Sequence, residues 1–141
     1  IKARGTAGER SWNIGIEQPE ADRGVTNLQI QLRDAALATS GDYRNYYEKD
    51  GIRVSHTIDP RTGFPITHQL ASVSVISSST MTADAWATAL SVLGPEEAFS
   101  LAEQHKLAIY MLIRDEDGRF SPRSTALFEQ FVQSSKQGDI P

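Results

Sequence analysis

Two helical segments that follow one another directly, between two apolar strands, constrain the fold of this chain most. Residues 70–77 alternate in the manner of a strand, with Ala71, Val73 and Val75 on one side, and residues 107–114 form an apolar run of strand length. The residues between these two segments show helical patterns. Strands, then two adjacent helices, then strands again are typical of an α+β domain rather than of a regular βαβ repeat. We therefore expect an α+β fold in which a mixed or antiparallel sheet packs against helices.

Local signals predict where both helices begin and end. A cluster of serine and threonine at residues 77–80 predicts the N-cap of a helix over residues 81–93, and Gly94 predicts its end. Pro95 is favourable in the first turn of a second helix, since its missing N–H has no partner there, and two glutamates complement the helix dipole. The second helix is expected to run to about His105.

The first half of the chain predicts strands and turns. Residues 1–4 and 11–17 predict two strands joined by a glycine-containing turn, and residues 25–33 alternate in the manner of another strand. A Lys-Asp-Gly turn predicts a hairpin whose second strand ends at His56. Residues 58–65 contain two prolines and a glycine, which predict a rigid loop.

Composition excludes several classes of function. The chain has 141 residues, a length typical of one domain. Its 14 Lys and Arg against 18 Asp and Glu leave a net charge of −4 without a clustered basic surface, so we expect no nucleic-acid binding. With no cysteine, the chain has no disulfide, thiolate metal site or cysteine nucleophile. No apolar run approaches the roughly 18 residues that a bilayer requires.

Asp84 and Thr88 are the first candidates for a functional site. They stand four residues apart in the predicted helix, so their side chains share one face. A carboxylate and a hydroxyl offer two hard oxygens, which Mg²⁺ prefers, although the remaining ligands would have to come from elsewhere. In the structural alternative, Asp84 complements the helix dipole and Thr88 bonds a backbone carbonyl. The spacing alone favours that alternative.

His56 is the second candidate. It stands at the end of a predicted strand, before a stiff loop that would hold its ring in one direction. Imidazole titrates near neutral pH and suits proton transfer. In the structural alternative, His56 is a hydrogen-bonded strand residue and Asp59 forms an Asx turn before Pro60. The residues alone favour this alternative, and His68 and His105 are weaker candidates still.

The third candidate is the segment at residues 40–47, in which a glycine turn stands beside three tyrosines and an arginine. Such a segment could stack a planar ring or meet a phosphate. Tyrosines in this setting are more often packed on the surface of a hairpin, so the segment alone decides nothing. The chain contains no Walker or dinucleotide-binding fingerprint.

Taken together, these segments resemble the ApbE family of flavin transferases. The resemblance covers residues from about 2 to 114, in the family's order and spacing. It rests on WNIGI at 12–16, SGDYR at 40–44, KDG at 49–51, HTIDPRTGFP at 56–65, ASVSV at 71–75, ADAWATAL at 83–90 and VLGP at 92–95.

The resemblance implies an activity and a site. Members of the family are FAD:protein FMN transferases with a T-fold-like catalytic domain. They need Mg²⁺ and attach FMN through its phosphate to a threonine hydroxyl of an acceptor flavoprotein, with release of AMP. On this resemblance Asp84 and Thr88 correspond to the metal ligands, and His56 corresponds to the histidine that assists proton transfer. Thr57 and Ile58 lie where the family's chain lines the FAD pocket.

Two features depart from the family pattern. Some members carry a second acid where this chain has Ala87, so a leaner metal shell is expected. The family's N-terminal half, with a lysine and much of the FAD pocket, has no counterpart here. Residues 1–141 are therefore expected to be the C-terminal portion of a single catalytic domain. The expected partner is either the missing half or another chain, such as a second copy in a homodimer.

Two other functions stay open from the residues. Hydrolysis of FAD to FMN and AMP would use the same site with water as the nucleophile. A non-catalytic flavin-binding protein would keep the pocket without turnover. By family resemblance, we expect the protein in the bacterial periplasm, as a lipoprotein of the inner membrane.

Overall fold

A central antiparallel sheet organises the part of the chain that the computed structural model describes, namely residues 1–19, 26–42, 46–49 and 52–132. Within these residues the sheet has four strands in the order β10–β9–β8–β3, and each neighbouring pair is antiparallel. The α+β expectation is confirmed, and the sheet is antiparallel rather than mixed. The strands are β3 (Ala36–Gly41), β8 (Leu70–Ser77), β9 (Ala108–Arg114) and β10 (Phe120–Ser124).

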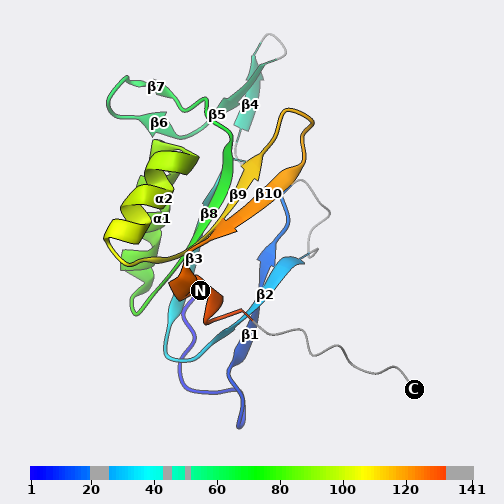
Figure 1. Cartoon of the computed structure of the whole chain (residues 1–141), viewed down its shortest axis with the longest axis vertical. Helices are drawn as coiled ribbons and strands as arrows, with labels where there is room; N and C mark the ends of the chain where they lie inside the picture. The colour runs from blue at the N-terminus through cyan, green and yellow to red at the C-terminus, as the bar shows by residue number, and fades with distance from the viewer. Residues whose placement is uncertain (20–25, 43–45, 50–51, 133–141) are drawn as a thin grey trace, which may run out of the picture.

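Helices α1 (Thr80–Leu93) and α2 (Pro95–Gln104) connect β8 to β9 and cover one face of this sheet (Figure 1). The predicted boundaries are confirmed. The Ser79 side chain caps α1 by accepting a hydrogen bond from the backbone N–H of Thr82, and Gly94 ends the helix at φ 81°. In the described parts of the chain, no helix is both long and apolar enough to cross a bilayer.

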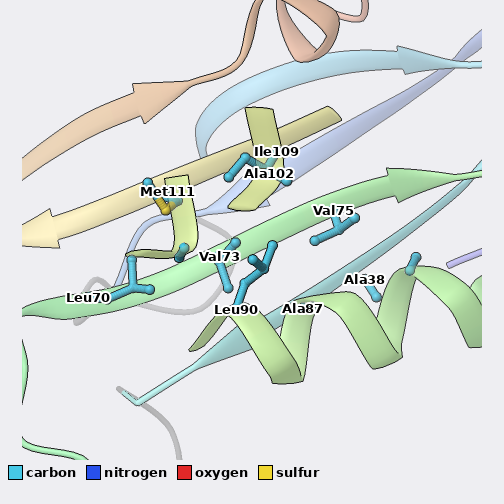
Figure 2. Close-up of a cluster of buried hydrophobic side chains, with 11 residues drawn as sticks. Ala38, Leu70, Val73, Val75, Ala87, Leu90, Ala102, Ile109 and Met111 are labelled. Carbon is cyan, nitrogen blue, oxygen red and sulfur yellow. The ribbon is translucent and has the colours of Figure 1, made fainter. Parts of the chain in front are cut away.

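Alternation along β8 and β9 sends side chains to two separate cores. On one face, Val73, Val75, Ile109 and Met111 pack against α1 and α2, where Leu90 is fully buried (Figure 2). Because strand side chains alternate with a period of two, the residues between these point to the opposite face. The helices therefore cover only one face of the sheet, and the other face needs a second layer.

Strands β1 (Trp12–Glu17) and β2 (Thr26–Leu32) and the short helix α3 (Ala126–Glu129) supply that second layer. Their buried side chains join the opposite face of the sheet in one cluster, which includes Ile16, Ile30, Leu32, Tyr110, Leu112 and Phe128. β1 pairs with β2 in an antiparallel ladder. Figure 1 shows this ladder on the side of the sheet away from α1 and α2. The sequence patterns do not predict α3.

Two small hairpins lie at the same end of the molecule, at the top of Figure 1. β4 (Tyr46–Lys49) pairs with β5 (Ile52–Ser55), which confirms the predicted hairpin. β6 (Ile58–Asp59) pairs with β7 (Phe64–Pro65), so the predicted rigid loop is a short hairpin. This β6–β7 hairpin leads directly from His56 toward β8.

Residues 1–4 correct one prediction. They do not pair with residues 11–17; instead Lys2 forms a single antiparallel bridge with Ala36 at the edge of β3. The backbone N–H of Ala3 donates to the carbonyl of Ala35 at 2.9 Å. The choice of strand partner depends on the tertiary fold, because periodicity marks a strand but not its neighbour.

The predicted turn at residues 40–42 also differs. Ser40 and Gly41 are the last residues of β3, so the chain leaves the sheet only at Asp42. Residues 43–45, which carry part of the third candidate segment, lie outside the described residues, as do the side chains of Tyr46 and Tyr47.

Candidate functional site

A cleft of about 520 Å³ opens between the edge of β3, the end of β1 and the first turns of α1. Its polar lining includes His56, Asp84 and Thr80, which come from two different parts of the chain. Glu17 and Ser40 line it as well. The fold thus brings together two of the residues singled out from the sequence, His56 and Asp84.

Helix α1 directs Asp84 away from the core. Ala83 and Ala87 are fully buried against the sheet, whereas Asp84 and Thr88 are exposed on the other side of the helix. Among the described residues, neither the Asp84 carboxylate nor the Thr88 hydroxyl has a hydrogen-bond partner. The structural alternative, in which Thr88 bonds a backbone carbonyl, is therefore not formed. Both oxygens are available to a ligand.

His56 is held by the backbone that follows it. The Thr57 N–H donates to the Ser55 hydroxyl at 3.1 Å, and the Ile66 N–H donates to the Thr57 carbonyl at 3.0 Å. The His56 side chain is exposed and lines the cleft. The backbone is anchored at Thr57, so the exposed His56 ring is presented to the cleft in a defined direction, where it can contact a ligand.

The other predicted site residues do not line this cleft. Thr88 is one helical turn beyond Asp84 on the same face of α1, but it does not line the cleft. Thr57 is half-buried and Ile58 is exposed on β6, which contacts α1. The structure thus groups His56 with Asp84, and places Thr57, Ile58 and Thr88 outside the lining.

The donor set of α1 fits part of a magnesium site. Asp84 and Thr88 present hard, unpartnered oxygens on one helix face, the ligand type that Mg²⁺ prefers. No group of three histidine, cysteine or acidic side chains that could hold a metal occurs among the residues the structure describes. A six-coordinate ion bound here would take its other ligands from water or from phosphate oxygens.

An ion-pair network anchors the segment beyond His56. Arg61 donates to the Asp59 carboxylate through Nε at 3.0 Å and Nη2 at 2.9 Å, and through Nη1 to Glu97 at 3.1 Å. The side-chain hydrogen bonds from Arg61, and a further one from its backbone N–H, hold the pKa of Asp59 below its ordinary value of 3.8. The side-chain hydrogen bonds to Asp59 and Glu97 raise the pKa of Arg61. Asp59 forms the predicted turn and, in addition, a charged contact.

Sequence reasoning missed several polar residues of the cleft. Glu17 ends an alternating strand, and Thr80 begins α1, so both are ordinary residues in their local patterns. Ser40 belongs to the third candidate segment, but it reaches the cleft from the end of β3. Only the packing of β1, β3 and α1 around one space reveals all three.

Comparison with known proteins shows which family the chain matches. A sequence model described as the ApbE family matches residues 1–112. The FAD:protein FMN transferase of Klebsiella pneumoniae (strain 342) is 41% identical over 137 residues, which are 96% of this chain and 39% of that protein. The FAD:protein FMN transferase of Vibrio cholerae serotype O1 is 44% identical over 121 residues, or 86% of this chain and 36% of that protein. The chain thus spans well under half the length of these curated relatives.

Solved structures agree with these relatives. The apo form of the Pseudomonas stutzeri flavinyl transferase ApbE superimposes with a TM-score of 0.71 at 45% identity, over 86% of this chain and 36% of that one. The ApbE protein of Thermotoga maritima superimposes with a TM-score of 0.78 at 30% identity, over 92% of this chain and 41% of that one. The chain and these structures therefore share one fold.

Proposed function

The chain belongs to the ApbE family, and from that premise we propose that its cleft serves the transfer of FMN from FAD to an acceptor protein. The juxtaposition of His56 and Asp84 in one cleft carries the proposal. An imidazole can accept a proton, and a free carboxylate can hold a cation beside a pyrophosphate. Two relatives that are 41% and 44% identical to this chain are FAD:protein FMN transferases, which supports the same activity.

The proposed reaction is a phosphoryl transfer. The hydroxyl oxygen of an acceptor threonine forms a bond to the phosphorus on the FMN side of FAD, and the bond from that phosphorus to the bridging oxygen breaks. AMP leaves with that oxygen. His56 accepts the hydroxyl proton as attack proceeds, which is general-base work. Such transfers depend on alignment and charge neutralisation more than on covalent chemistry, so a few placed side chains suffice.

Asp84 and Thr88 are proposed to hold Mg²⁺. When bound, the ion would neutralise charge on the pyrophosphate. Thr57 and Ile58 are proposed to contact FAD beyond the cleft, because β6 lies beside α1. The periplasm is proposed as the compartment on family resemblance, and fractionation of cells expressing the full-length protein tests it.

A transfer assay tests the proposed function. The full-length protein that carries this sequence is incubated with FAD, Mg²⁺ and a peptide that contains one reactive threonine. The expected result is a peptide whose mass rises by FMN, with one AMP released for each FMN attached. Free FMN with unmodified peptide would make the protein a hydrolase, and binding of FAD without AMP would make it a carrier.

The variant His56→Ala locates the proton acceptor in the same assay. It is expected to bind FAD as the wild type does and to transfer FMN about 100-fold or more slowly, the usual contribution of a placed acid or base. His105→Ala is the matched control, since His105 is also exposed but stands at the end of α2, away from the cleft lining. Equal rates in both variants would remove His56 from the mechanism.

A further inference from the structure

The β6–β7 hairpin and the residues that follow it contact the junction between α1 and α2 at two points. Arg61, in the turn of the hairpin, donates to Glu97 in the first turn of α2 at 3.1 Å. His68, which follows the hairpin, packs its ring against Gly94, the residue between the two helices. The hairpin carries the backbone after His56, and α1 carries Asp84. The two contacts therefore join the two sides of the proposed site.

Arg61 is the centre of the first contact. Its Nε and Nη2 form a two-pronged interaction with Asp59, and Nη1 reaches across to Glu97. The planar guanidinium suits this task, since its donors have a fixed geometry that a lysine ammonium cannot reproduce. Arg61 thus ties its own hairpin and the neighbouring helix with one rigid group.

Short, hydrogen-bonded paths lead from this contact to the two site residues. On one side, Ile58 pairs with Pro65, and the Thr57 carbonyl accepts from Ile66, so the hairpin is continuous with the residue after His56. On the other side, only Gly94 separates α2 from α1, and both helices pack into the same core. A shift of the hairpin against α2 would therefore move His56 relative to Asp84.

We propose that Arg61 is a positioning residue, which sets the placement of the His56 imidazole relative to Asp84 by bridging Asp59 and Glu97. The inference rests on the proposed function for its kinetic consequences and on the structure for its geometry. Arg61 does not line the cleft and has no chemical step of its own.

Exposure separates this role from a contribution to stability. Arg61 and Glu97 are each more than half exposed, and exposed ion pairs contribute little to the free energy of unfolding. The reaction rate depends more strongly than stability on the alignment of the site residues, since a displacement of about 1 Å costs on the order of 100-fold in rate. Loss of the contact should therefore lower the rate without lowering the melting temperature.

The test compares Glu97→Ala with Glu96→Ala in the full-length protein. Both glutamates lie in the first turn of α2 and both pair with an arginine, but Glu96 pairs with Arg123 of β10 instead of the hairpin. Each substitution removes the same charge from the same helix end, so the effect on the helix dipole is matched. Four quantities are measured: kcat, the KM for FAD, the melting temperature and the imidazole nitrogen resonances of His56.

Glu97→Ala is expected to lower kcat about 10-fold or more while the KM for FAD stays within about twofold. The His56 resonances should move, whereas the melting temperature should match that of Glu96→Ala. Glu97→Gln should restore part of kcat, because its amide oxygen still accepts from Arg61. Arg61→Lys should behave like Arg61→Ala, because it lacks the planar donors.

Two outcomes would overturn the inference. One is a kcat and a His56 spectrum in Glu97→Ala that equal those of Glu96→Ala. The other is a fall in kcat that is matched by a fall in melting temperature, which would make the contact structural. A wild-type protein without FMN transfer would instead overturn the proposed function, and the His56 resonances would still decide the positioning role.

Discussion

Asp84 stands on the exposed face of α1, between two alanines that are turned into the core one residue before it and three after it. Ser79 supplies the N-cap of this helix, and the first turn contains no acid. α1 therefore forms without help from the Asp84 carboxylate. The same holds for Thr88, whose hydroxyl makes no bond among the described residues. Oxygens that are exposed and uninvolved in folding are suited to ligand binding.

Asp84→Ala is expected to separate activity from stability. Magnesium-dependent FMN transfer should fall by at least about 10- to 100-fold, the loss that follows even when partners of metal ligands are changed. The free energy of unfolding should stay within about 0.5 kcal/mol of the wild type, as is usual for an exposed substitution. Transfer rates at several magnesium concentrations, with chemical denaturation, measure both.

Glu103→Ala is the control for this substitution, because Glu103 is an exposed acid of α2 that does not line the cleft. It should leave the magnesium dependence unchanged. Normal transfer by Asp84→Ala at low magnesium would contradict the assignment of Asp84 as a metal ligand.

At the scale of elements, the junction between α1 and α2 depends on one glycine. Gly94 has φ 81°, and a Cβ atom added there would lie 3.2 Å from Cγ and Cδ2 of the His68 ring. The ring cannot withdraw freely, because its Nδ1 accepts a hydrogen bond from the Leu70 N–H. Backbone conformation and packing both require glycine here, and the two helices can follow each other at a sharp corner.

Gly94→Ala should destabilise the protein by about 1–3 kcal/mol, from backbone strain together with the contact to His68. Gly118→Ala is the matched control: it has φ 79°, but its added Cβ would meet nothing within 4 Å. That control should cost only the backbone strain of a side chain at positive φ, about 1 kcal/mol. Thermal unfolding measures the stability of both variants. In the double variant Gly94→Ala/His68→Ala, part of the stability lost in Gly94→Ala should return, because the ring is no longer there. Equal losses in the two glycine variants would show that His68 does not contribute.

The β6–β7 hairpin should show a pH dependence that comes from Asp59. Its pKa is lower in the folded state than in the unfolded chain, where it is near 3.8, because Arg61 donates to its ionised form. The stabilisation is therefore complete above the unfolded pKa and is lost as the pH falls through that value toward the folded pKa. Neutral pH retains it.

Asp59→Asn is expected to melt at a lower temperature than the wild type at about pH 7, and the difference should shrink as the pH falls from about 5 to about 3. Thermal unfolding of both proteins across this range measures the change. A difference that stays constant with pH would mean that the carboxylate charge contributes nothing.

For the whole molecule, the central sheet has to be covered on both faces. Val73, Ile109 and Met111 belong to the core under the helices, and Tyr110 and Leu112 belong to the core under β1, β2 and α3. β8 and β9 contribute side chains to both cores. If one layer unfolds, it therefore exposes one face of the strands against which the other layer packs.

Leu90→Ala and Phe128→Ala test this coupling from opposite sides of the sheet. Both side chains are fully buried, one in each core. The substitutions should cost about 2–5 and about 3–5 kcal/mol respectively, through lost burial and the cavity left behind. We expect each variant to unfold in one transition that is the same when monitored by circular dichroism and by tryptophan fluorescence. Two transitions in Phe128→Ala would show that the second layer unfolds on its own.

The antiparallel order of the sheet and the cleft itself belong to the tertiary structure. Residues 1–4 read as a strand, but their neighbour is β3 rather than residues 11–17. His56 and Asp84 each looked more like an ordinary structural residue than a catalytic one in its own segment. Their meeting in one cleft, together with Glu17 and Thr80, depends on which strands and helices pack together.

Local sequence signals predict the helices and strands of this protein. The N-cap at Ser79, the glycine at 94 and the proline at 95 predicted both helix boundaries, and alternation predicted β8 over its full length. These signals act within a helical turn or between next neighbours, so they can be seen in a short window. Strand partners, the second layer and the bridge from Arg61 to Glu97 join distant residues. Burial and charge in the folded chain select such contacts, and a short window of sequence contains neither partner's surroundings, so these contacts become visible only in the folded molecule.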